Sequence, residues 1–123
     1  MNYRGVIIEE SLVDNSVFKE VITISSRVSK VTEKHKTPWL TQWTLRTVEV
    51  TENKADEIAE KLSKDLQKDP SSWYADYKND SHHFIVFPGK IFKVNLKNPV
   101  LYQEARKYGI GLGIPEYQVD FGS

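Results

Sequence analysis

The fold is decided by residues 73–94, WYADYKNDSHHFIVFPGKIFKV. Within this stretch, short runs of apolar or alternating residues are separated by two turn signals, Asn79-Asp80-Ser81 and Pro88-Gly89. The pattern predicts a β-meander of three antiparallel strands. The same stretch holds six of the fourteen aromatic residues of the chain and two of its three histidines, so candidate site residues concentrate here as well.

Further strands are predicted on the N-terminal side of this meander. Residues 3–9 contain a short apolar run that is typical of a first strand. Residues 19–31 alternate between apolar and polar side chains with a period of two, as a half-buried strand does. Residues 39–51 continue as another strand after a polar connection that contains a proline.

The strand at residues 39–51 changes phase along its length. Trp43 and Leu45 share one phase of the alternation, whereas Val48 and Val50 share the other. A regular strand would then turn one of these pairs to solvent. We expect a β-bulge near residues 46–47 to restore a single buried face. Burial of both faces is the alternative.

Two helices are predicted. Residues 53–68 carry apolar side chains at helical spacing on one side and charged side chains elsewhere, which indicates an amphipathic helix packed on the sheet. A second helix is expected to open at Asn98-Pro99, where a capping residue precedes proline. It should end with Gly109 as the left-handed cap and Ile110 as the apolar contact beyond it.

The predicted order of elements is β-β-β-α-β-β-β-α, which indicates an α+β fold. We expect an antiparallel or mixed sheet of five or six strands, with both helices packed on one face. No internal repeat or long Gly/Ser linker divides the sequence, so we expect one domain covering residues 1–123.

The composition is that of an ordinary globular domain, with 39% hydrophobic residues, 28% charged residues and a formal net charge of zero. The chain contains no cysteine, which excludes disulfides and thiolate chemistry and favours a reducing compartment. The apolar run near the N-terminus is too short for a signal peptide, and no segment resembles the run of about 20 apolar residues that spans a membrane. We therefore expect a cytoplasmic protein with no membrane contact.

The histidines of the meander give the first candidate site. His82 and His83 are neighbours on a strand, so their side chains point to opposite faces and do not chelate one metal ion. If the hairpin turns on Asn79-Asp80, Asp76 lies opposite His83 and can orient its imidazole as a general base. If the turn shifts by one residue, Tyr77 faces His83 instead. A purely structural hydrogen bond is the alternative interpretation.

The aromatic side chains give the second candidate site. Trp73, Tyr74 and Tyr77, together with Trp39 and Trp43, could form a stacking platform for a base, a sugar or a peptide. Tryptophans on strands more commonly bury their large apolar area, so packing in the core is the favoured interpretation. No aromatic-and-glycine signature of an RNA-recognition strand is present.

A basic stretch gives the third candidate. Between residues 21 and 47, five basic residues stand against a single acidic one, whereas residues 48–80 carry nine acidic residues against five lysines. This asymmetry could mark a nucleic-acid surface, but the positive stretch is dilute. The basic residues are Arg27, Lys30, Lys34, Lys36 and Arg46.

The apolar run Phe84-Ile85-Val86-Phe87 bears on possible partners. Both alternating faces of this strand are apolar, so both should be covered. Because two helices on one face leave the other open, that other face needs the C-terminal tail, the region 39–45 or a second copy of the chain as its cover. We therefore expect a homodimer formed through a sheet face.

These patterns favour a non-enzymatic protein-interaction or binding module. The alternative is a small enzyme or ligand-binding protein with a pocket at the 73–94 meander that uses Asp76 and His83. A third hypothesis, nucleic-acid binding through residues 27–46, is the weakest. The sequence indicates no cofactor and no metal site, since no third ligand stands at a diagnostic spacing from the histidines.

Overall fold

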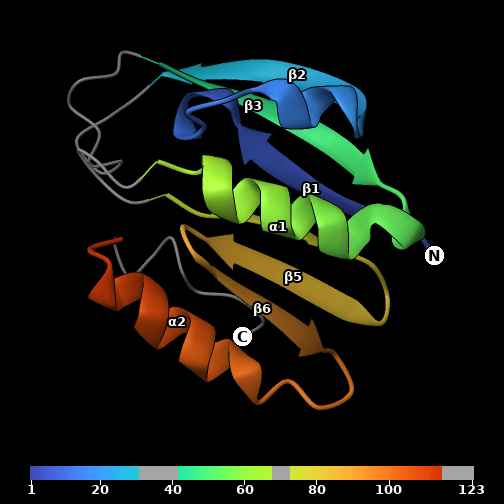
Figure 1. Ribbon diagram of the computed structural model, residues 1–123, viewed down its shortest axis with the longest axis vertical. Helices are drawn as coiled ribbons and strands as arrows, with labels where there is room; N and C mark the ends of the chain where they lie inside the picture. The colour runs from blue at the N-terminus through green and yellow to red at the C-terminus, as the bar shows by residue number, and fades with distance from the viewer. Residues whose placement is uncertain (31–41, 68–72, 115–123) are drawn as a thin grey trace.

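The computed structural model describes residues 1–30, 42–67 and 73–114 (Figure 1). Its elements follow the predicted order, and the predicted α+β fold is confirmed. Among the described residues, three short 3-10 turns lie between the longer elements: η1 (Glu9–Ser11), η2 (Ser16–Lys19) and η4 (Glu52–Lys54). The strands and helices are β1 (Tyr3–Ile8), β2 (Ile22–Lys30), β3 (Gln42–Val50), α1 (Ala55–Asp65), β4 (Ala75–Lys78), β5 (His82–Phe87), β6 (Lys90–Asn95) and α2 (Leu101–Gly111).

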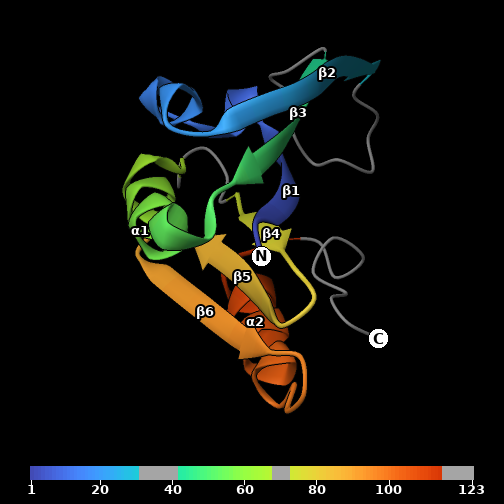
Figure 2. The same cartoon turned by 90° about the vertical axis from the view of Figure 1, so that its right-hand side faces the viewer.

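The six strands form one antiparallel sheet in the order β2-β3-β1-β4-β5-β6. The first strand, β1, lies inside the sheet and pairs with both β3 and β4. Because β1 is antiparallel to each of them, β3 and β4 run parallel, and α1 supplies the crossover that such a pair requires. Strands β2 and β6 lie at opposite ends of the sheet (Figure 2).

The helices lie on opposite faces of the sheet, and the prediction that both pack on one face is wrong. Phe84 and Val86 of β5 belong to the cluster that contains the buried residues of α1. Their neighbours Ile85 and Phe87 point to the other face and pack with the residues of α2. Alternation along β5 therefore separates the two helices.

This arrangement removes the reason for a dimer through the face of β5. All four residues from Phe84 to Phe87 are at most 1% exposed within a single chain. The apolar pattern of β5 did require cover on both faces, as expected for a strand of this kind. That cover comes from α1 and α2 and needs no second copy.

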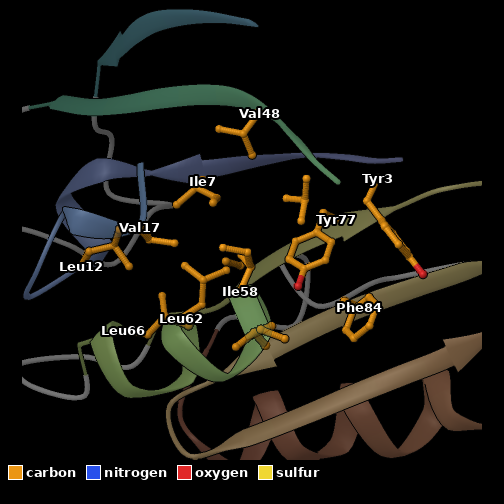
Figure 3. Close-up of a cluster of buried hydrophobic side chains, with 14 of the residues drawn as sticks. Tyr3, Ile7, Leu12, Val17, Val48, Ile58, Leu62, Leu66, Tyr77 and Phe84 are labelled. Carbon is orange, nitrogen blue, oxygen red and sulfur yellow. The ribbon is translucent and has the colours of Figure 1, made fainter. Parts of the chain in front are cut away.

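The larger core lies between α1 and the sheet (Figure 3). Ile58 and Leu62 of α1 are fully buried, and burial of each such side chain contributes about 1.5–3 kcal/mol. The hydroxyl of Tyr77 donates a hydrogen bond to the Ala55 carbonyl and so ties β4 to the first turn of α1. The sheet residues of this core include Tyr3, Ile7, Val48, Tyr77 and Phe84.

The predicted bulge at residues 46–47 of β3 is wrong, and the alternative of burial on both faces is correct. The pairing of β3 with β1 is regular from Val50 to Leu45. Trp43 and Val48 are both buried, although their phases differ. The register shift lies instead in β2, between Thr23 and Ser25.

The predicted end of the second helix is also wrong, because α2 continues to Gly111. Gly113, with φ of 91°, is the left-handed residue after the helix. The Gly113 N–H donates to the Ile110 carbonyl at 3.0 Å, and the Ile114 N–H donates to the Gly109 carbonyl at 3.1 Å. These two bonds form a Schellman motif, with buried Ile114 as its apolar contact.

Candidate functional site

The structure brings Asp76 and His83 together and adds Tyr102, a residue that the sequence analysis did not single out. Nε2 of His83 lies 2.7 Å from Oδ2 of Asp76, and Nδ1 lies 2.8 Å from the Tyr102 hydroxyl. The three side chains come from β4, β5 and α2. They therefore form a hydrogen-bonded chain between the sheet and the helix that covers it.

The hairpin register differs from both registers that the sequence analysis considered. Lys78, and neither Asp76 nor Tyr77, lies opposite His83. Relative to the first register the strands have slipped by two residues, which preserves the face to which each side chain points. Asp76 and His83 are consequently diagonal neighbours on one face, within reach of a direct hydrogen bond.

Asn79 fixes this register. Its side-chain Oδ1 accepts hydrogen bonds from the backbone N–H of Ser81 at 2.9 Å and of His82 at 2.8 Å. The Asn79 N–H donates to the His82 carbonyl at 3.0 Å, which leaves Asp80 and Ser81 as the two-residue loop. An asparagine side chain that bonds to the backbone two residues ahead is a common way to start a turn.

Both ring nitrogens of His83 are already engaged, and the residue is only 5% exposed. In the neutral imidazole, Nε2–H donates to the Asp76 carboxylate and Nδ1 accepts from the Tyr102 hydroxyl. In the protonated imidazole both N–H groups donate. The chain therefore fixes the ring in either state, but neither nitrogen is turned toward an incoming substrate.

The phenols beside Asp76 are held in their neutral form. Burial raises the pKa of Tyr102, and the Asp76 carboxylate raises it further. The same two causes, in the same order, raise the pKa of Tyr74. A phenolate base or nucleophile at neutral pH is therefore disfavoured at both positions.

The other described aromatic residues of the predicted platform are in the core or packed against it. Tyr77 points to the opposite face of the sheet from His83 and is fully buried. Trp73 is 6% exposed and packs against Trp43, with ring centroids 5.2 Å apart. Trp39 lies outside the described residues. Tyr74 and Phe87 are in ring contact at 5.9 Å.

The described basic residues do not gather on one surface. Arg27 and Lys30 are exposed on β2 but point to opposite faces of the sheet. Arg46 is paired with Glu9 at 3.1 Å, and its guanidinium carbon lies 4.2 Å from the centre of the Phe18 ring. Lys34 and Lys36 lie outside the described residues.

A second candidate surface is the free edge of the sheet at β2. Among the described residues this nine-residue strand pairs only with β3, and it is exposed along almost its whole length. Ile22, Ile24 and Val28 are 53%, 44% and 60% exposed. An exposed edge strand of this length is a template for the addition of another strand.

The described residues thus form an α+β fold with a hydrogen-bonded Asp-His-Tyr chain and a long exposed edge strand, β2. Comparison with protein-family models, with curated proteins and with solved structures found no match to this chain. In the part of the chain that the structure describes, no three His, Asp or Glu side chains gather to hold a metal ion. No described helix is long and apolar enough to cross a membrane.

Proposed function

We propose that this protein is a non-enzymatic interaction module that forms a homodimer by pairing β2 with β2 of a second copy. The observation that carries the proposal is the exposure of three β-branched side chains on a nine-residue edge strand. Exposed edges of this kind are usually blocked or paired, because they otherwise recruit strands without control. The cytoplasmic location expected from the sequence remains part of the proposal.

A twofold axis near Ser26, the midpoint of β2, would pair the strand with its copy in the second chain. In that antiparallel arrangement Ile24 of each copy lies opposite Val28 of the other. The two Lys30 residues lie at opposite ends of the paired strands, and each lies opposite the uncharged Ile22 of the other copy. Residues 25–27, at the centre of this pairing, pair regularly with β3, whereas Ile24 lies at the register shift between Thr23 and Ser25.

The affinity of such a dimer should be moderate. Main-chain hydrogen bonds contribute about 0.5–1.5 kcal/mol each, and cross-strand apolar pairs about 0.2–1 kcal/mol. A single pair of edges buries less than the roughly 1,200–2,000 Å² of a standard interface. We therefore expect a dissociation constant on the order of 10 μM.

Sedimentation velocity over a concentration series that spans this value tests the proposal. The wild-type protein should shift from the mass of one chain to the mass of two. Val28→Lys should abolish the shift, because it places a charge against Ile24 of the second copy. Val100→Lys is the matched control, since Val100 is 67% exposed near the start of α2, away from the edge.

A wild-type protein that remains monomeric throughout the series contradicts the proposal. A dimer that Val28→Lys and Val100→Lys affect equally also contradicts it, because the interface would then lie elsewhere. Circular dichroism melts of both variants should match the wild type, because each replaced side chain is exposed.

A small enzyme or ligand-binding protein at the meander is the second candidate, and the Asp76-His83 contact favours it. Its weakness is that Asp76 and Tyr102 occupy both ring nitrogens of His83. Reaction with diethyl pyrocarbonate, read by mass spectrometry of peptides, discriminates between the two. Rapid modification of His83 in the folded protein would support an acid-base site, and protection of His83 would support a structural role.

A further inference from the structure

A groove lies between α2 and β6, at the opposite end of the sheet from β2. Its volume is about 580 Å³, which falls within the range of sites for small organic ligands. One wall is the face of β6, and the other is the C-terminal half of α2. The lining includes Lys90, Phe92, Lys107, Tyr108, Gly111 and Leu112.

The floor of the groove is aromatic and firmly held. The rings of Phe92 and Tyr108 lie 5.8 Å apart, and both contact the fully buried ring of Phe87. Phe92 is itself only 7% exposed. Because these rings are already ordered by the core, a flat apolar ligand could stack on them without ordering new side chains.

Both walls of the groove carry an ammonium group. The Lys90 ammonium lies 5.3 Å from the centre of the Phe92 ring, and Lys107 lines the opposite wall. Glu104 is the single acidic residue among the described side chains that line the groove. Within the described residues neither lysine forms an ion pair, so both charges are available to a ligand.

We propose that the groove binds a small ligand with a flat aromatic body and one carboxylate. The aromatic body would lie against Tyr108 and the exposed part of Phe92, and the carboxylate would lie between the ammonium groups of Lys90 and Lys107. Glu104 disfavours a second negative charge on the ligand. The inference is independent of the proposed dimer, because the two surfaces lie at opposite ends of the sheet.

Gly111 makes the site testable without damage to the fold. Gly111 lines the groove, and a Cβ built at this position meets no neighbouring atom within 4 Å, so a larger side chain fits there without a clash. Gly111 is the last residue of α2 and has no left-handed φ, so the replacement introduces no backbone strain. Gly111→Leu should therefore fill the groove and leave the protein folded.

Titration of the full-length protein with 2-naphthoate, followed by ¹H–¹⁵N NMR, tests the proposal. We expect saturable shifts in residues 107–112 and 90–92, and much weaker binding of the uncharged analogue 2-naphthamide. Lys90→Gln and Lys107→Gln should each weaken binding about two- to five-fold, as expected for an exposed ion pair. Lys64→Gln, on the helix that covers the other face, should leave the affinity unchanged.

Gly111→Leu should abolish binding while its spectrum remains that of a folded protein. Retention of wild-type affinity by this variant would overturn the proposal, and so would equal affinity for the acid and the amide. Absence of any saturable shift with 2-naphthoate would overturn it as well. Val28→Lys should bind 2-naphthoate as the wild type does. The proposed dimer and the proposed ligand site can therefore fail independently of each other.

Discussion

At Gly5 the backbones of β1 and β4 approach so closely that no side chain fits between them. A Cβ at this position would lie 2.0 Å from the Asp76 carbonyl oxygen and 2.7 Å from the Tyr77 Cα. Both atoms belong to backbone that cannot turn away as a flexible side chain does. Gly5 is therefore required for the β1–β4 pairing that connects the two halves of the sheet.

Gly5→Ala should destabilise the protein by about 1–3 kcal/mol or more, the usual cost of forcing extra volume into a packed site. The urea midpoint measures this loss. The matched control is Gly111→Ala, which adds the same methyl group where nothing lies within 4 Å and should be neutral or slightly stabilising. Equal midpoints for Gly5→Ala and the wild type would contradict the close approach.

His83 connects three elements through two hydrogen bonds. Replacing it should therefore lower the free energy of unfolding more than replacing either of its partners does. His83→Ala removes both bonds, and we expect a loss of about 2–3 kcal/mol of unfolding free energy. Tyr102→Phe removes one bond and should cost about 1 kcal/mol. In the double variant the second change should add little, because its partner is already absent. Strict additivity in urea unfolding would show that the chain is not a connected unit.

At the scale of elements, the end of α2 depends on backbone conformation and not on space. Gly113 has φ of 91°, yet a Cβ there meets nothing within 4 Å. Gly113→Ala should therefore cost about 1 kcal/mol through its left-handed conformation alone. Gly113→Asn should recover part of this loss, because asparagine tolerates that conformation. Thermal unfolding of the two variants compares them directly, and a fully stable Gly113→Ala would contradict the assignment.

The sequence predicted the helix-ending pattern but not its position. A glycine followed by isoleucine occurs at residues 109–110 and again at residues 113–114, and each pair satisfies the local rule. The second pair ends the helix, and its Ile114 is buried against the residues of α2 and β6. Tertiary packing therefore decides which of the two glycines ends the helix, and a local sequence pattern carries no information about that packing.

The faces of the sheet illustrate the same limit. The apolar run Phe84–Phe87 correctly indicated a strand covered on both sides, but it did not say which elements supply the cover. The apolar pattern of each amphipathic helix shows that it packs on the sheet, but this pattern is compatible with either face. The Asp76-His83 contact could be anticipated because strand alternation survives a two-residue slip. Tyr102 was missed because no local signal connects it to a strand nineteen residues earlier.

At the scale of the whole molecule, the two open surfaces lie at opposite ends of the sheet. The helices seal the middle of the sheet from both sides, while β2 and the α2–β6 groove remain accessible at its two ends. A dimer formed at one end therefore leaves the other end free. Two copies joined through β2 would carry their grooves at the two extremities of a continuous sheet of twelve strands, twice the six of one chain.

The buried tyrosines make the stability of the whole fold sensitive to alkaline pH. Burial is the largest cause that raises the pKa of Tyr3, Tyr74, Tyr77 and Tyr102 above the ordinary value of 10.0. At pH values above 10 the unfolded chain therefore releases phenolic protons that the folded chain retains. Ionisation then favours the unfolded state, and stability that is complete below pH 10 should fall as pH rises further.

Urea unfolding at pH values from about 8 to 11 should show this decline, which begins near the ordinary tyrosine pKa of about 10. The tyrosinate absorbance at 295 nm that comes from these four phenols should rise with the unfolding transition. Tyr74→Phe is an informative variant, because it removes one phenol whose pKa is raised while retaining the apolar ring. Its stability should fall less steeply above pH 10 than that of the wild type. A wild-type stability that stays constant to pH 11 would mean that these phenols ionise as readily in the folded chain as in the unfolded one.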